Sequence, residues 1–274
     1  GGSADQRQAA AAPRAQGPAP EQVPDISGIH LVYRPVWDPT RQAVNAGHLA
    51  VVVDVNGAQM TLSDFTAQYD SAKAIAAVNG LVLRRLVAGL QAMQATGYKN
   101  LVLFPVNRQF VETDTGLRLL LDQLQQIPEA LRPLVVPEIT DAYFGSWPAL
   151  APAVAVMRRA CRAVCVRLSL DHKDFAAVAA AGVALVSGHL ADHDWPERQS
   201  LAAMNSFAEL AAKAGLKTLV GGLDTSSLVI AAMSAGVNLL AGAAIGAGED
   251  APPAHRALSV EGFYLSKYAA AQPE

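Results

Sequence analysis

The sequence predicts an α/β fold in which eight strands and the helices between them close into one barrel. Eight short segments rich in β-branched residues or Leu show little apolar–polar alternation, which is typical of strands buried on both faces. Longer segments with helical spacing separate most of them, and Gly182, Gly215 and Gly236 each stand between a helix and the next strand. The 274 residues, 51% of them hydrophobic, suit a single barrel of ~250 residues. A TIM-like (β/α)8 barrel is therefore expected in place of an open doubly wound sheet.

The first two strands are expected to depart from this repeat. A short turn, with no helix, joins them, so they could form an antiparallel hairpin at the start of the barrel. The loop after Val36 reads WDPT and has no Gly, which argues against the glycine fingerprint of a dinucleotide-binding fold. The eight expected strands are 29–36, 48–55, 101–106, 134–139, 163–170, 183–187, 218–221 and 238–242.

Six segments between the strands are expected to be helices. In the first, apolar residues such as Ile75, Val78 and Leu86 recur at helical spacing, and Gly97 follows as a plausible C-terminal cap. The full set is 72–95, 115–126, 148–162, 173–181, 197–214 and 226–235.

The chain divides into two parts. Residues 1–24 are rich in Ala, Gln, Pro and Gly without apolar periodicity, so we expect a flexible linker there. Its first residues, Gly-Gly-Ser, are typical of a cloning remnant, so the natural protein is expected to extend upstream, where it could carry a membrane anchor. Residues 25–274 form the predicted barrel domain.

Composition excludes several classes of protein. The net charge is −3, the basic residues are scattered, and aromatic residues make up 6% of the chain, which argues against a nucleic-acid surface. No run approaches the ~18 apolar residues of a membrane span, so no membrane contact is expected. Cys161 and Cys165 are interpreted as small buried residues, since no His forms a metal-ligand pattern with them. A reducing, cytoplasmic compartment is expected.

Five short motifs stand in order along the predicted barrel: YRPV at 33–36, VNR at 106–108, PEITD at 137–141, LDH at 170–172 and GGLDT at 221–225. They resemble Y-Q-P-I, V-N-L-S, L-E-I-T-E, the start of D-D-F-G-T-G, and E-G-V-E-T of the EAL domain of bacterial cyclic di-GMP phosphodiesterases. The resemblance covers about residues 29–250 and implies an EAL-type barrel with a metal site at its strand ends.

The resemblance also implies that this site is degenerate. It assigns the vestigial metal-site positions to His48, Asn107, Glu138, Asp171, His172 and Asp224. His48 replaces the Glu of E-A-L, and His172 replaces the second Asp of D-D-F-G-T-G. Val52 stands where the family has a phosphate-contacting Arg, the family's catalytic Lys has no counterpart at 186–189, and Gly221 replaces a Glu. Family members hold two divalent cations, which need several hard oxygen ligands.

We therefore expect a pseudoenzyme without catalytic residues, bound metal or other cofactor. The expected role is regulation in bacterial signalling, through an unknown protein partner or self-association by helices such as 197–214 and 226–235. One alternative is a cyclic di-GMP receptor in which Arg34, Arg108 and Lys173 bind phosphate. Another is a barrel enzyme of different chemistry.

Three smaller features leave alternatives open. His48, Glu138, Asp171 and His172 could form a mixed nitrogen–oxygen metal site, or His48 could hydrogen-bond a neighbouring carboxylate. The glycine-rich segment 242–248 could bind phosphate or be a turn-rich loop. The cluster of His189, Asp192, His193 and Asp194 looks like a metal motif, but a polar loop before a helix is the simpler interpretation.

Overall fold

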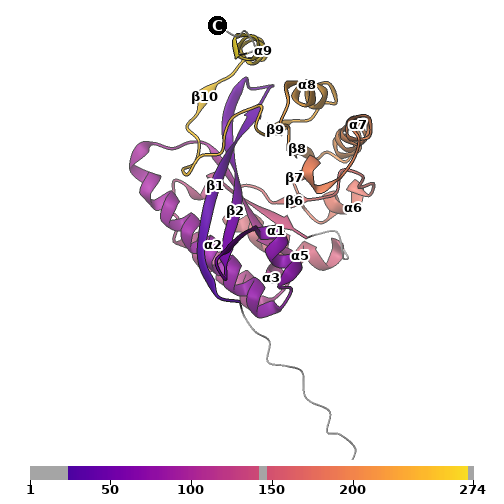
Figure 1. Cartoon of the computed structure of the whole chain (residues 1–274). Coiled ribbons are helices and arrows are strands. Elements are labelled where there is room, and N and C mark those ends of the chain that lie inside the picture. The colour runs from indigo at the N-terminus through magenta and orange to yellow at the C-terminus, as the bar shows by residue number, and fades with distance from the viewer. Residues whose placement is uncertain (1–23, 142–146, 271–274) are drawn as a thin grey trace, which may run out of the picture.

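A computed structural model describes residues 24–141 and 147–270, with side chains described as far as residue 265. Nearly all of the predicted linker, 1–24, lies outside the described residues. Within them, eight strands close into a ring that helices surround (Figure 1). This confirms the predicted (β/α)8 barrel.

The ring runs in the order β1-β9-β8-β7-β6-β5-β4-β2, and β2 pairs with β1 again. β1 is antiparallel to both of its neighbours, whereas all other neighbours in the ring are parallel, so the antiparallel first strand is also confirmed. The ring strands are β1 (Ile26–Asp38), β2 (Ala43–Val55), β4 (Leu101–Asn107), β5 (Val135–Thr140), β6 (Cys165–Arg167), β7 (Leu185–His189), β8 (Lys217–Gly221) and β9 (Leu239–Ala241).

The ribbon of β1 and β2 is longer than predicted and continues past the barrel. A third strand, β3 (Ala58–Thr61), folds back on β2 through a two-residue turn at Asn56 and Gly57. Both turn residues have positive φ, 51° and 80°, as this type of tight hairpin requires. The Asn-Gly pair is a sequence signal for such a turn, but the sequence analysis did not use it. It therefore missed β3 and the helix that follows, α1 (Leu62–Gln68).

The six predicted helices are present with small shifts at their ends. Ser71, Thr113 and Thr225 cap three of them by accepting a backbone N–H with the side chain. These helices are α2 (Ala72–Met93), α4 (Asp114–Gln125), α5 (Trp147–Ala160), α6 (Phe175–Ala180), α7 (Glu197–Lys213) and α8 (Ser226–Ser234). Further elements that the sequence analysis did not predict are η1 (Gln94–Thr96), α3 (Arg108–Val111), η2 (Arg132–Leu134), η3 (Leu190–Asp192), β10 (Arg256–Ala257) and α9 (Val260–Ala270).

The barrel interior contains a layer to which each ring strand contributes one small or aliphatic side chain. Its members are Val36, Ala46, Leu103, Val136, Cys165, Leu185, Leu219 and Ala241. A larger apolar cluster fills the space between the strands and the helices. Cys161 and Cys165 are both buried, which agrees with their interpretation as small core residues.

Two contacts of Trp37 hold the C-terminal segment to the barrel. The fully buried Trp37 donates from Nε1 to the carbonyl oxygen of Leu258 at 2.8 Å and stacks on Phe263 at 5.2 Å between ring centroids.

The segment 72–96 is long and apolar enough to cross a membrane by length and composition alone. In this fold 56% of its apolar 18-residue window is buried, as is common for a core helix.

Candidate functional site

A pocket of about 560 Å³ opens at the carboxyl ends of the parallel strands, where barrels of this class carry their reactive groups. One wall comes from β2, the last residue of β3, α1 and the carboxyl end of β5. The opposite wall comes from the ends of β6, β7 and β8. The polar side chains that line it are Arg34, His48, Thr61, Ser63, Asp64, Thr66, Glu138, Thr140, Asp141, Arg167, His189, Asp192 and Asp224.

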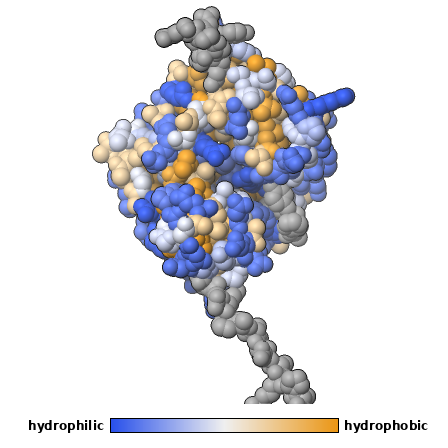
Figure 2. All heavy atoms as spheres, in the orientation of Figure 1, coloured by the Kyte–Doolittle hydropathy of each residue, from blue (hydrophilic) through white to orange (hydrophobic). Residues whose placement is uncertain are grey.

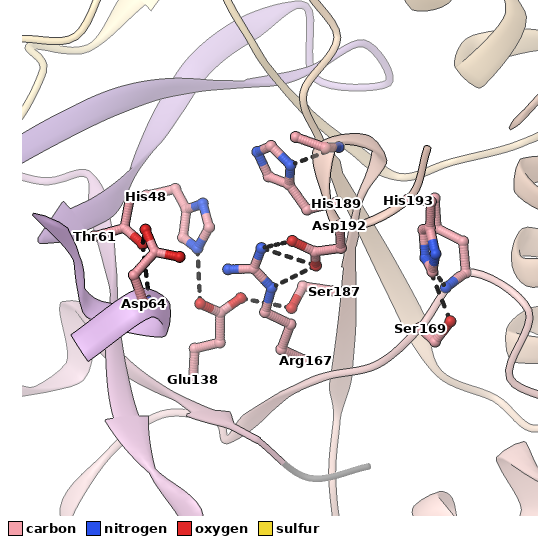
Figure 3. Close-up of polar contacts among 12 residues, drawn as sticks. His48, Thr61, Asp64, Glu138, Arg167, Ser169, Ser187, His189, Asp192 and His193 are labelled. Carbon is pink, nitrogen blue, oxygen red and sulfur yellow. Dashed lines mark hydrogen bonds and ion pairs between the residues drawn. The ribbon is translucent and has the colours of Figure 1, made fainter. Parts of the chain in front are cut away.

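Glu138 lies at the centre of this pocket and is held from two sides (Figure 3). His48 Nε2 donates to Glu138 Oε2 at 2.8 Å, and Ser187 Oγ donates to Glu138 Oε1 at 2.5 Å. The three side chains come from β2, β5 and β7 and are almost completely buried. Burial alone would raise the pKa of Glu138, but the charge and hydrogen bond of His48, with Arg167 and Ser187, lower it to about 2.

Arg167 extends from the end of β6 beside Glu138 and forms a forked ion pair with Asp192 in η3 (Figure 3). Its Nη2 lies 2.8 Å from Asp192 Oδ1, and its Nε lies 3.1 Å from Oδ2. Burial first, and then the positive charge of Arg167, lower the pKa of the neighbouring His189 to about 4. His189 Nδ1 accepts the Ala191 N–H at 3.1 Å and so begins η3.

A second, partly buried carboxylate, Asp141, also lines the pocket. Asn107 caps α3 by accepting the Gln109 N–H at 2.8 Å, and its side-chain amide donates to Asp141 Oδ2 at 2.7 Å. Burial raises the pKa of Asp141, and the hydrogen bonds from Thr140 and Asn107 oppose that rise only in part. Asn107 therefore supports the pocket through Asp141 and is not among the lining residues.

The structure brings four of the nine predicted site residues together. Arg34, His48, Glu138 and Asp224 line the pocket, and Asp224 accepts the Ala243 N–H at 3.0 Å. The hydrogen bond between His48 and a carboxylate was one of two interpretations considered from the sequence, and it is the contact observed.

The other predicted residues lie outside the pocket. Arg108 is paired with Glu112 at 2.6 Å, and Lys173 donates to Ser206 at 3.1 Å. Asp171 accepts a hydrogen bond from Ser169, and the His172 ring packs edge-on against Trp147 and Phe175. The four-residue set of His48, Glu138, Asp171 and His172 is therefore not assembled here.

The displacement of Asp171 has a simple cause. The predicted strand 163–170 is three residues long in the structure, and it ends at Arg167. Arg167 therefore occupies the strand-end position that the sequence analysis gave to Asp171. The prediction also missed Asp64 as a lining residue and Ser187 as a hydrogen-bond partner of Glu138. It had noted Asp192 only as part of a polar loop. For Arg167, the visible signal was a charged side chain inside an apolar strand segment.

Among the described residues there is no group of three or more His, Cys, Asp and Glu side chains placed to hold a metal ion. Both oxygens of Glu138 already accept hydrogen bonds, and Arg167 places a positive charge beside them. The residues at the pocket centre do not fit a pair of divalent cations, which require several converging oxygen ligands.

Comparison of the sequence with protein-family models and with curated proteins gives no match. The fold, however, matches solved structures. An EAL domain protein from Listeria monocytogenes superimposes with a TM-score of 0.61 at 14% identity, over 88% of this chain and 93% of that one. The EAL domain of FimX from Xanthomonas citri, solved in complex with c-di-GMP, gives 0.62 at 16% identity, over 81% and 88%.

A third similar structure is YkuI from Bacillus subtilis, a protein with an EAL domain in complex with substrate c-di-GMP and calcium. It gives a TM-score of 0.69 at 14% identity, over 89% of this chain and 60% of that one. Identities this low support a statement about the fold alone. The chain has the fold of an EAL domain.

Proposed function

We propose that this chain is a non-hydrolytic EAL-like domain that acts in regulation by contacting another protein. The observation that carries the first part is the hydrogen-bonded set of Glu138, His48 and Ser187 with Arg167 alongside. A carboxylate neutralised by its own neighbours is a poor ligand for a divalent cation, because binding the ion would require breaking those contacts. Without the cations there is nothing to activate a water for phosphodiester hydrolysis.

The test is a hydrolysis assay of the purified chain with cyclic di-GMP and Mg²⁺ or Mn²⁺, analysed by chromatography for linear product. We expect no turnover above a no-protein blank, under conditions in which an active EAL domain converts all substrate. The variant His48→Glu, which restores a carboxylate on β2, is expected to stay inactive because Arg167 is still present. Turnover by the unaltered chain would contradict the proposal.

The proposed protein contact uses α8. Val229 and Ala232 of this helix face the barrel, and Leu228 and Met233 are partly buried at the edge of the same core. Ile230 is also partly buried but does not pack against that core. A helix with apolar side chains on nearly every side is unusual at a water-exposed surface. Hydrophobic side chains gather in Figure 2 around the place that α8 occupies in Figure 1.

A second copy of the chain is the simplest partner to test. Light scattering after size exclusion, over a range of concentrations, should show association that Ile230→Asp removes. The matched control is Ser234→Asp, an exposed position at the end of the same helix. If the chain is monomeric and Ile230→Asp also fails to alter recovery of proteins from the source lysate, the contact role is wrong.

Cyclic di-GMP reception without hydrolysis is the second candidate. The supporting observations are Arg34 at the pocket and the c-di-GMP that the FimX and YkuI structures contain. Titration calorimetry in EDTA should then show saturable binding that Arg34→Gln weakens by about tenfold, the value expected for losing one charged hydrogen bond. Absence of heat and of any thermal shift would remove this candidate and leave the contact role untouched.

A further inference from the structure

A second, larger cavity of about 1,100 Å³ lies at the opposite end of the barrel. It is lined by the residues that precede or begin β2, β4, β5, β6, β7, β8 and β9, together with the last residue of β1 and the segment before β10. In this class of barrel the reactive groups lie at the carboxyl ends of the strands. The amino-end cavity is therefore separate from the site described above.

The floor of this cavity is apolar. Val136 and Leu185 belong to the layer of side chains inside the barrel, and both line the cavity. Leu101, Ala163 and Leu239 pack against the same layer and are only partly buried. The interior of the barrel is thus within reach of a molecule that enters from this end, and an apolar group placed there would be removed from water.

The rim carries positive charge. Four cationic side chains from different parts of the chain line the cavity. They are Arg41, Lys99 and Arg162, which precede β2, β4 and β6, and Lys217, the first residue of β8. Asp38 is the only carboxylate among the cavity-lining residues, and it lies 3.6 Å from the guanidinium of Arg41. The side chains of Lys99, Arg162 and Lys217 have no hydrogen-bonding or ionic partner in the part of the chain that the structure describes.

We propose that the amino-end cavity binds a small amphipathic anion, a molecule with an apolar body and one carboxylate or phosphate group. The apolar body would lie against Leu101, Val136 and Leu239, and the anionic group would pair with Lys99, Arg162 and Lys217. Lys99, Arg162 and Lys217 line one opening, and their like charges give it a positive potential that attracts an anion. An apolar floor without charge, or a charged rim over a polar floor, would not select this class of ligand. The inference is independent of the proposed regulatory function.

Titration calorimetry with decanoate, decyl phosphate and decanol, each below its critical micelle concentration, tests the class of ligand. Saturable binding of one or both anions, with decanol at least about tenfold weaker, is expected because decanol lacks the charge. The two anions together show which head group is preferred. Failure of both anions to bind would overturn the proposal.

Two variants locate the binding. The triple variant Lys99→Gln, Arg162→Gln, Lys217→Gln should weaken anion binding at least about tenfold. Ala184→Trp, at an exposed position that lines the cavity, should block it without altering the core. The matched control is Lys73→Gln with Arg85→Gln, two exposed cations on α2 that line neither cavity.

Thermal unfolding by circular dichroism verifies that each variant is folded. If Ala184→Trp does not fold, the triple variant decides alone, since it changes only exposed side chains. Anion binding that survives the triple variant, or that Lys73→Gln with Arg85→Gln reduces equally, would show that the cavity is not the site.

Discussion

Glu138 is fully buried in the carboxyl-end pocket, and its charge depends on partners from two other strands. His48 and Ser187 satisfy both of its oxygens, and Arg167 adds a positive charge nearby. Removing one partner of such a buried pair leaves the remaining charge without compensation, which costs more than the pair itself contributes.

For Glu138→Gln we therefore expect a loss of about 3 kcal/mol in the free energy of unfolding at pH 7. The folded pKa, about 2, lies below the ordinary value of 4.5, so this carboxylate stabilises the fold above pH 4.5. That contribution is lost as the pH falls from 4.5 towards 2. Urea unfolding at pH 7, 4.5 and 3 should show a shallower decline for the variant than for the unaltered chain.

The matched control is Asp64→Asn at the edge of the same pocket, a more exposed carboxylate that bonds Thr61 in its own turn. A Glu138→Gln protein as stable at pH 7 as the unaltered chain would contradict the assignment of Glu138 as a compensated buried charge.

The pKa of His189 is also lowered, but here the fold favours the neutral form of the side chain. Burial and the charge of Arg167 lower its pKa from 6.5 to about 4, so the folded protein binds fewer protons than the unfolded chain between these values. Stability therefore falls as the pH drops from 6.5 to 4. His189→Asn, whose side-chain oxygen can still accept the Ala191 N–H, should flatten this part of the pH profile. Equal slopes for both proteins between pH 6.5 and 4 would show that another group is responsible.

At the scale of elements, the loop after β9 depends on Gly242. A Cβ atom at this position would lie 2.3 Å from the backbone oxygen of Leu223 in the loop after β8. Backbone hydrogen bonds join the same two loops, from Leu223 to Ala241 and from Ala244 to Leu223, both at 3.1 Å. The glycine thus permits two backbone segments to approach closely, which favours the turn interpretation of the glycine-rich segment.

Gly242→Ala is accordingly expected to destabilise the fold by about 3 kcal/mol, because the backbone of one loop must move. Gly215→Ala is the control. Gly215 has a positive φ of 75°, but a Cβ atom added at this position would meet no atom within 4 Å. Its cost should be limited to backbone strain, about 1 kcal/mol. Guanidinium unfolding of both variants tests this, and equal losses would contradict the role of close approach.

At the scale of the whole molecule, neighbouring strands of the barrel differ in the number of residues that pair between them. Six residue pairs join β4 to β5, whereas β9 has two pairs with β8 and two with β1. β9 is also where the antiparallel β1 closes the ring. Local opening is expected first at the strand that the fewest backbone hydrogen bonds join to its neighbours.

Hydrogen exchange followed by mass spectrometry should therefore show the amides of β9 exchanging before those of β5. Peptides covering 239–241 and 135–140 provide the comparison in one experiment. Equal protection of the two strands would mean that the barrel opens only by global unfolding.

Much of the fold could be predicted because its signals are local. Apolar segments without alternation, helices at 3.6-residue spacing and the glycines at helix ends each depend on neighbours in the chain. Two of the missed elements, β3 and α1, follow the extended part of the β1–β2 ribbon. That extension is stabilised by pairing with β2 and not by an apolar pattern of its own.

The site was less predictable because strand ends decide which side chains meet. His48, Glu138 and Asp224 lie near their expected places, since their strands end about where the sequence indicates. β6 ends three residues early, and this shift replaces Asp171 with Arg167 and changes the charge at the pocket. Helix and strand ends depend on tertiary packing more than on local preference.

The sequence by itself determined the alternation of strands and helices and the barrel that they form. These follow from side-chain chemistry and periodicity alone. Only the tertiary structure decided that Arg167 stands beside Glu138, that His48 and Ser187 occupy both of its oxygens, and that three cations surround an apolar opening at the other end. His48 and Glu138, for example, are 90 positions apart in the sequence. Residues this distant become neighbours only once the ring of strands has closed.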